Sequence, residues 1–250
     1  MQAESDFGIR LAEMSGGDLR NAIPRESNTV LVVPEIKASE FEEFVAGYET
    51  MYKAEFADTE PDLIFTCQKA PMPVKVMNQG EQFRFIRAIF ACPNGVQRMS
   101  QSMKGLVETS NNLAIVKCSG GSFEAHNLCR SSVDSAKEAT AWKIAAVFQL
   151  IGAEVKLAGG YPGWKPNMNS PILKTMSKVY SDMFGKVPEI RAIHAGLETG
   201  IIAGSYPKLD MISFGPTIRY PHSPDEKVNI PSVVKFYDFL CETLKQAPVK

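Results

Sequence analysis

The chain has 250 residues, enough for two domains of ordinary size, and its apolar and charged fractions are those of a soluble globular protein. Its formal net charge of -1 gives no general attraction for nucleic acid or for an anionic membrane surface, so neither partner is expected. No apolar run reaches the roughly 20 residues that span a bilayer. Residues 1–10 lack the apolar core of a signal peptide, and we therefore expect a cytoplasmic location.

The first part of the chain predicts a mixture of helices and strands. A short helix is expected at residues 4–14, an amphipathic helix after a capping box formed by Ser39 and Glu42, and a further helix at residues 81–90. Apolar or β-branched runs predict four strands, the last two joined as a hairpin by Gly120-Gly121: residues 29–33, 63–67, 113–118 and 122–130.

From residue 132 the pattern changes to helices that alternate with short apolar runs. Capping and stop signals predict four helices: from the Ser135–Glu138 capping box to Gly152, from Ser170-Pro171 to Gly185, after Glu198, and from Pro231 to Lys245. The apolar runs predict three strands: residues 155–157, 190–193 and 211–214. Such alternation is typical of a doubly wound α/β domain, and the change of pattern predicts a domain boundary near residues 131–135.

Ligands of open α/β sheets lie beyond the carboxyl ends of the strands. Residues 194–198 and 215–222 follow the two clearest predicted strands, so these two segments are the leading candidates for a site. His222 lies between two prolines on an irregular loop, where an imidazole suits a metal ligand and Glu226 could orient its second nitrogen. A surface position or a satisfied core position is the alternative for this histidine.

Four further positions each have a structural interpretation beside a functional one. His194 could be an ordinary residue at a strand end, and Glu198 could only complement a helix dipole. Arg130 could clamp a carboxylate by two parallel hydrogen bonds or form an ion pair at the surface or between domains. The acidic pair Glu42-Glu43 lies on an amphipathic helix, which favours a solvated face.

The five cysteines form no CxxC pair, and no phosphate loop, GxSxG or HExxH motif is present.

Eight strings in order along nearly the whole chain resemble the aminoacyl-histidine dipeptidases, a branch of the co-catalytic zinc exopeptidases. The strings are Gly16-Gly17 with residues 21–26, Gly95-Val96 with Met99-Ser100, residues 105–114, Arg130-Ser131-Ser132, residues 161–166, residues 194–198, residues 213–216, and residues 222–226. The resemblance implies a mixed α+β lid and dimerisation domain over residues 1–131. Residues 132–250 are then the C-terminal part of a doubly wound α/β catalytic domain.

The resemblance also implies a function and the residues that carry it. In this family two zinc ions share a bridging water, a glutamate takes its proton, and the peptide carbonyl of a dipeptide such as carnosine is attacked. By motif, His222 is a zinc ligand, Arg130 holds the terminal carboxylate of the substrate, and Gly215 and Pro216 form the wall beside the scissile bond. His194 belongs to the substrate site, and we infer that Glu198 receives the free amino group of the dipeptide.

The remaining metal ligands of the family, which lie in its N-terminal segment together with the general base, match no part of this chain. We therefore expect that the chain alone is inactive and that the full-length parent is a cytoplasmic, homodimeric zinc dipeptidase with a preference for Xaa-His substrates. The alternative is a non-catalytic dimerisation or binding module derived from such a peptidase. A different α/β hydrolase is disfavoured because no nucleophile motif is present.

Overall fold

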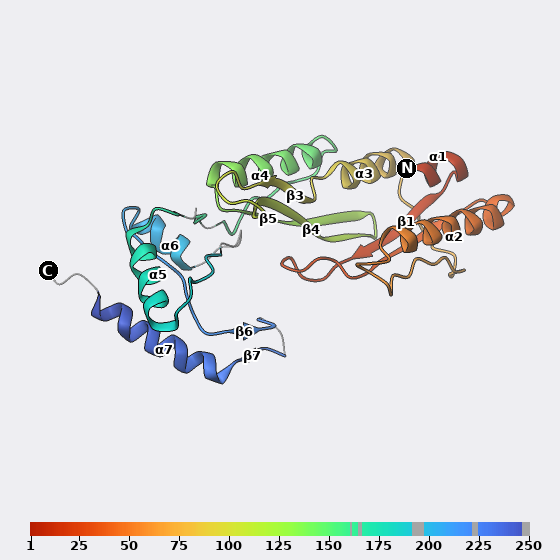
Figure 1. Ribbon diagram of the computed structural model, residues 1–250. Helices are drawn as coiled ribbons and strands as arrows, with labels where there is room; N and C mark the ends of the chain where they lie inside the picture. The colour runs from red at the N-terminus through yellow and green to blue at the C-terminus, as the bar shows by residue number, and fades with distance from the viewer. Residues whose placement is uncertain (161, 165–166, 192–197, 222–224, 247–250) are drawn as a thin grey trace. The chain divides into compact units, whose positions relative to one another are not determined.

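A computed structural model describes residues 1–160, 162–164, 167–191, 198–221 and 225–246 (Figure 1). The chain forms two compact units. Unit 1 comprises residues 1–97, 110–129 and 138–157, and unit 2 comprises residues 98–109, 130–137 and 158–250. The units interleave in sequence because the ends of several strands group with the C-terminal part of the chain. The lid and catalytic domains expected on either side of residue 131 remain a prediction.

The first segment of the chain corrects the sequence prediction. Helix α1 covers only Gln2–Phe7, and Gly8 ends it with a φ of 66° that an L-residue with a side chain rarely adopts. Strand β1, Arg10–Gly16, then occupies residues 10–14 of the span predicted to be helical. Leu11 is the one buried residue of β1, and the strand pairs with β2 and β4, so pairing with neighbouring strands overrides the helical pattern.

Five strands form one sheet, in the order β2-β1-β4-β3, with β5 also paired to β4. Their bounds are β1 Arg10–Gly16, β2 Ser27–Val32, β3 Gly95–Met99, β4 Val107–Ser119 and β5 Ser122–Ser131. Strand β1 is antiparallel to β2 and to β4, with Met14 opposite Cys118 in the second pair. The predicted strand at residues 29–33 and the predicted β4–β5 hairpin are confirmed, since Gly120 and Gly121 supply the positive φ of the turn.

Helices α3, Gln79–Ala91, and α4, Asp134–Gln149, lie along one face of this sheet (Figure 1). Ala88 and Cys92 pack there against Ile144 and Phe148. Helix α2, Ala38–Glu55, follows a single 3-10 turn at Glu35–Lys37 and packs Phe41 into a second cluster with Phe7 and Ile9. The three helices were predicted. The capping boxes at Ser39 and Ser135 were not correct, because both serines lie inside their helices rather than before them.

The side chain of Gln82, in the core of unit 1, forms hydrogen bonds with backbone groups of Ile9 and Leu11, where the chain passes from α1 into β1. It is fully buried, and its Oε1 accepts a hydrogen bond from Leu11 N at 2.7 Å. Its Nε2 donates to Ile9 O and to Glu4 Oε1, each at 3.0 Å. A buried amide with both ends satisfied avoids the desolvation cost of an unpaired polar group. Gln82 therefore fixes the register between α3 and the start of β1.

All five cysteines are free, which agrees with the absence of paired motifs in the sequence. Burial, and secondarily the neighbouring Cys129, raises the pKa of the Cys92 thiol to about 11. The Sγ atoms of Cys92 and Cys129 contact the side-chain oxygens of Asn127 and Asn111, at 3.5 and 3.3 Å. Thiols of high pKa are poor nucleophiles, so we assign these two cysteines to packing and not to catalysis.

Unit 2 contains three helices, α5 Pro171–Phe184, α6 Glu198–Ser205 and α7 Ile230–Lys245, and a two-stranded ladder, β6 Ile218–Arg219 with β7 Lys227–Val228. The predicted signals of α5 are confirmed: Ser170 Oγ accepts from Leu173 N at 3.1 Å, and Gly185 ends the helix at a φ of 68°. Helix α7 begins after Asn229, whose side chain caps Ser232 N at 3.0 Å.

The predicted strands at residues 63–67, 155–157 and 211–214 do not pair into any sheet, nor do residues 190 and 191. Residues 192–193 of the fourth predicted strand lie outside the described residues. An apolar, β-branched run favours an extended chain, but a strand also needs a neighbour for its N–H and C=O groups. The described residues are therefore mixed α/β without the predicted parallel sheet. No helix in the described ranges is long and apolar enough to cross a membrane.

Candidate functional site

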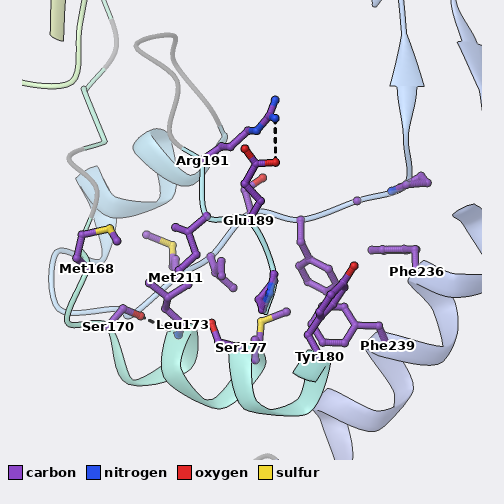
Figure 2. A pocket seen from close by; sticks show the side chains of 18 of the residues that line it. Met168, Ser170, Leu173, Ser177, Tyr180, Glu189, Arg191, Met211, Phe236 and Phe239 are labelled. Atoms are coloured by element: carbon purple, nitrogen blue, oxygen red, sulfur yellow. Dashed lines mark hydrogen bonds and ion pairs between the residues drawn. The ribbon is translucent and has the colours of Figure 1, made fainter. Parts of the chain in front are cut away.

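A cavity of about 630 Å³ lies in unit 2 between helices α5 and α7 and the segments at residues 188–191 and 211–217. In Figure 2, Leu173, Ser177 and Tyr180 point into it from α5, while Phe236 and Phe239 face it from α7. These residues follow helical spacing, so each helix presents one face to the cavity. The sequence predicted helices over both segments, but it named none of these five residues as part of a site.

Aromatic rings and one lysine form the end of this cavity where α5 meets α7. The Tyr180 and Phe239 rings lie edge to face with centroids 5.3 Å apart, and Phe214 contacts Phe239 at 5.6 Å. Lys235 Nζ donates to the Tyr180 hydroxyl at 2.6 Å and lies 4.3 Å from the centroid of the Phe184 ring. The ammonium group is thus held by one hydrogen bond and by the faces of two rings.

Gly215 and Pro216, predicted to form the wall beside the scissile bond, both line the cavity. The chain that follows them is anchored to the start of α7. Thr217 N donates to Ser232 Oγ at 2.9 Å, and Thr217 O accepts from Asn229 N at the same distance. The structure therefore places these two residues at a concave surface of the kind that binds small ligands.

Across the cavity, Glu189 and Arg191 form an exposed ion pair of 2.9 Å (Figure 2). An exposed pair of this kind contributes about 0–1 kcal/mol to stability. Both side chains belong to the polar lining of a predominantly apolar cavity.

Arg130 is the penultimate residue of β5, and helix α4 begins at Asp134. It is half-buried, and its side chain forms no hydrogen bond or ion pair with any described residue, so the predicted ion-pair role has no partner in that part of the chain. The next residue, Ser131, is buried, and its Oγ lies 2.9 Å from Thr109 Oγ1. A guanidinium held from its backbone side and without a side-chain partner among the described residues suits the binding of an external anion.

The loop at Pro162-Gly163 packs against the backbone that follows Arg130. Gly163 N donates to Asp134 Oδ1 at 2.9 Å, and a Cβ on Gly163 would lie 2.8 Å from the backbone carbon of Ser132. Hydrogen bonds from Lys137 and, secondarily, from Gly163 N hold the pKa of Asp134 below its usual range. Gly163 entered the sequence analysis only as part of the string at residues 161–166, because a close backbone approach leaves no other signal.

Glu198 is the exposed first residue of α6, as the sequence predicted. Gly200, two residues later, packs on the same loop, because a Cβ at this position would lie 2.6 Å from Pro162 O. The structure thus joins the strand end that carries Arg130, the Pro162-Gly163 loop and the helix that begins with Glu198. Any contact of Glu198 with a substrate remains a prediction.

Two of the predicted site residues, His194 and the metal ligand His222, lie outside the described residues. Within the described part of the chain, no group of three or more histidine, cysteine, aspartate or glutamate side chains is arranged to hold a metal ion. His126, the third histidine of the chain, lies on β5 with its Nε2 3.3 Å from Glu124 Oε2 and is part of no such group.

Comparison with known proteins agrees with the resemblance seen in the sequence. Residues 22–246 match the model of peptidase family M20/M25/M40. Among curated proteins, the chain is 39% identical over 245 residues to the cytosol non-specific dipeptidase of Escherichia coli (strain K12). That match covers 98% of this chain and 50% of the relative, so the chain spans about half the length of the curated protein that it matches.

Two solved structures resemble this chain to different degrees. The crystal structure of the aminoacylhistidine dipeptidase from Vibrio alginolyticus matches with a TM-score of 0.90 and 38% identity, over 99% of this chain and 50% of that one. The aminopeptidase PepT from Bacillus cereus matches with a TM-score of 0.54 and 17% identity, over 66% of this chain and 44% of that one, and shows a likeness of fold alone. The chain therefore belongs to peptidase family M20/M25/M40.

Proposed function

We propose that this chain is the C-terminal half of a cytoplasmic dipeptidase that hydrolyses Xaa-His dipeptides such as carnosine. One observation carries the proposal: nearly the whole chain aligns, at 38–39% identity, with half of two proteins that are named as dipeptidases. The family to which it belongs consists of peptidases, so peptide hydrolysis follows from the family. The preference for Xaa-His dipeptides is the more specific part of the proposal.

Arg130, Glu198 and the Gly215-Pro216 wall are the residues that we assign to the substrate. The guanidinium of Arg130, without a partner among the described residues, would bind the terminal carboxylate of the dipeptide by two hydrogen bonds. The Glu198 carboxylate at the start of α6 would pair with the free amino group at the other end. Two oppositely charged anchors select a substrate short enough to reach both, which is the requirement for a dipeptidase.

We further propose that the complete protein binds two zinc ions, with His222 as the one ligand from this chain. Bound zinc would supply an activated water and polarise the peptide carbonyl. The described residues hold no group of three ligands, and a zinc site commonly uses three or more protein ligands. We infer from the half-length match to both dipeptidases that residues outside this chain complete the site, and we expect the chain alone to be inactive. A homodimer is expected from the family.

Replacement of His222 in the full-length protein tests the assignment. We expect His222→Ala to lose both carnosine hydrolysis and part of the bound zinc, measured by a product assay and by elemental analysis. His126→Ala is the matched control, because the His126 ring pairs with Glu124 on its own strand, belongs to no metal-binding group among the described residues, and should keep activity and zinc. Full activity and full zinc content in the His222 variant would defeat the metal role.

A non-catalytic dimerisation or binding module is the second candidate, favoured by the half-length match to both dipeptidases. Size-exclusion chromatography and zinc analysis of the 250-residue chain separate the two candidates. The module is supported if the chain folds as a dimer that binds no zinc. The same organism should then have no longer version of this protein with dipeptidase activity. Hydrolysis of carnosine by this chain alone would overturn our account of the missing ligands.

A further inference from the structure

A line of hydrogen-bonded side chains runs behind the strand end that carries Arg130. Ser131 Oγ lies 2.9 Å from Thr109 Oγ1, and Thr109 Oγ1 lies 3.3 Å from Glu108 Oε1. Arg98 donates to the same Glu108 oxygen. Thr109 is 1% exposed, while Ser131 and Glu108 are 8% exposed each, so the line is shielded from water.

The two hydroxyl groups in this line have a fixed direction. Each hydroxyl carries one proton, and a carboxylate only accepts, so the proton of Thr109 points to Glu108. Ser131 must then donate to Thr109 Oγ1, and its own oxygen accepts from Val133 N at 3.0 Å. The order is Val133 to Ser131 to Thr109 to Glu108, with every buried hydroxyl satisfied as donor and as acceptor. Such a network has one low-energy arrangement.

This arrangement fixes the backbone on the C-terminal side of Arg130. Ser131 is its immediate neighbour, and Ser132 N donates to Glu108 O at 3.2 Å, so the turn is held through side chain and main chain together. No described side chain holds the Arg130 guanidinium itself. Its position is therefore set by its backbone and by the packing around the strand end.

We propose that Thr109 and Ser131, supported by Glu108, are positioning residues that hold Arg130 for the terminal carboxylate of the dipeptide. A bidentate clamp tolerates little displacement, since a shift of about 1 Å at a binding group can lower activity about a hundredfold. Selectivity for a free carboxylate over an amide at the end of the substrate then depends on the buried hydroxyl pair. This inference rests on the proposed function, in which Arg130 contacts the substrate.

Thr109→Val in the complete, zinc-loaded protein tests the inference, because valine keeps the shape of threonine and removes the hydroxyl. We expect the KM for carnosine to rise about tenfold, because the loss corresponds to about one hydrogen bond to a charged group. The kcat should stay within about twofold of that of the unmodified protein. The kcat/KM for carnosine amide should hardly change, so the acid-to-amide selectivity falls. Thr109→Ser should restore it. Ser131→Ala, which breaks the same line at its other hydroxyl, decides the question if Thr109→Val does not fold.

Two reference variants separate the possible failures. Thr50→Val is the matched control, because the Thr50 hydroxyl donates only to Ala46 O on the exposed surface of α2. Arg130→Gln removes the guanidinium and shows how far the acid-to-amide selectivity falls when the carboxylate contact is lost entirely. If Arg130→Gln lowers the acid-to-amide selectivity and neither hydroxyl variant does, the positioning role is overturned and the proposed function stands. Equal losses for acid and amide also overturn the positioning role. If Arg130→Gln leaves carnosine turnover unchanged, or no dipeptide is cleaved, the proposed function falls and the inference with it.

Discussion

The two compact units satisfy their backbone and their apolar side chains by different means. Unit 1 is built on the strands of a paired sheet, and three buried clusters fill the space between these strands and the helices. Among its described residues, unit 2 has a short two-stranded ladder of its own, and its helices surround a cavity of about 630 Å³. The comparison teaches that paired strands support packed clusters in unit 1, whereas the described helices of unit 2 leave a cavity between them.

Core truncation is expected to show the largest difference between the units. Phe85→Ala in unit 1 should lower the free energy of unfolding by about 3–5 kcal/mol, because Phe85 is 1% exposed and packed against Leu11 and Cys118. Phe239→Ala, on the half-buried edge of the cavity, should cost about half as much.

The two tryptophans make this comparison measurable by urea unfolding. Trp142 lies in unit 1 and Trp164 in unit 2, so a Trp142→Phe background reports on unit 2 and a Trp164→Phe background on unit 1. We expect Phe85→Ala to shift mainly the transition seen by Trp142. Identical shifts of both transitions would mean that the units unfold as one.

Close backbone contacts should produce the next largest effect, confined to unit 2. A Cβ on Gly163 would lie 2.8 Å from the Ser132 backbone, so Gly163→Ala should cost about 1–3 kcal/mol through local displacement. Gly160→Ala is the matched control, since nothing lies within 4 Å of its Cβ position. The transition monitored by Trp164 in a Trp142→Phe background checks this, and equal stability of the two variants would contradict the contact.

Helix caps offer one matched pair across the units. Ser170 caps α5 in unit 2 and Asn78 caps α3 in unit 1, each by accepting a backbone N–H at 3.1 and 2.9 Å. Replacement of either by alanine should cost about 1 kcal/mol, because one helix donor loses its partner. Thermal unfolding followed by circular dichroism measures both. A much smaller effect at Ser170 would show that unit 2 depends less on α5 than the packing suggests.

Acidification should give the smallest effect and should act on unit 1. Burial alone would raise the pKa of Glu4, but hydrogen bonds from Arg87 and Gln82 outweigh it and leave that pKa below its usual value of 4.5. A lowered folded pKa means that the stabilisation is present above about pH 4.5 and is lost as the pH falls through the folded pKa. Glu4→Gln should flatten this dependence between pH 5 and 3 in urea titrations followed by Trp142. An unchanged dependence would place the acid sensitivity elsewhere.

Most helices and the hairpin of the sheet were predictable because their signals are local. Ser170 with Pro171 starts α5 and Gly185 ends it, and both act within a turn of the residues that they govern. The family was also predictable, since motif order survives without any structure. The error at residues 10–14 arose because a pattern of apolar residues fits a helix and a strand alike until partners are known.

The sequence by itself determined the bounds of α5 and α7, the β4–β5 hairpin and the family of the chain. Tertiary structure alone decided that Arg130 lacks a partner among the described residues, that Thr109 and Ser131 form a directed pair, and that the apolar run at residues 211–214 pairs with no strand. Capping and turn formation involve residues a few positions apart, whereas burial and strand pairing join residues distant in sequence. Such long-range contacts leave no local pattern from which they can be read.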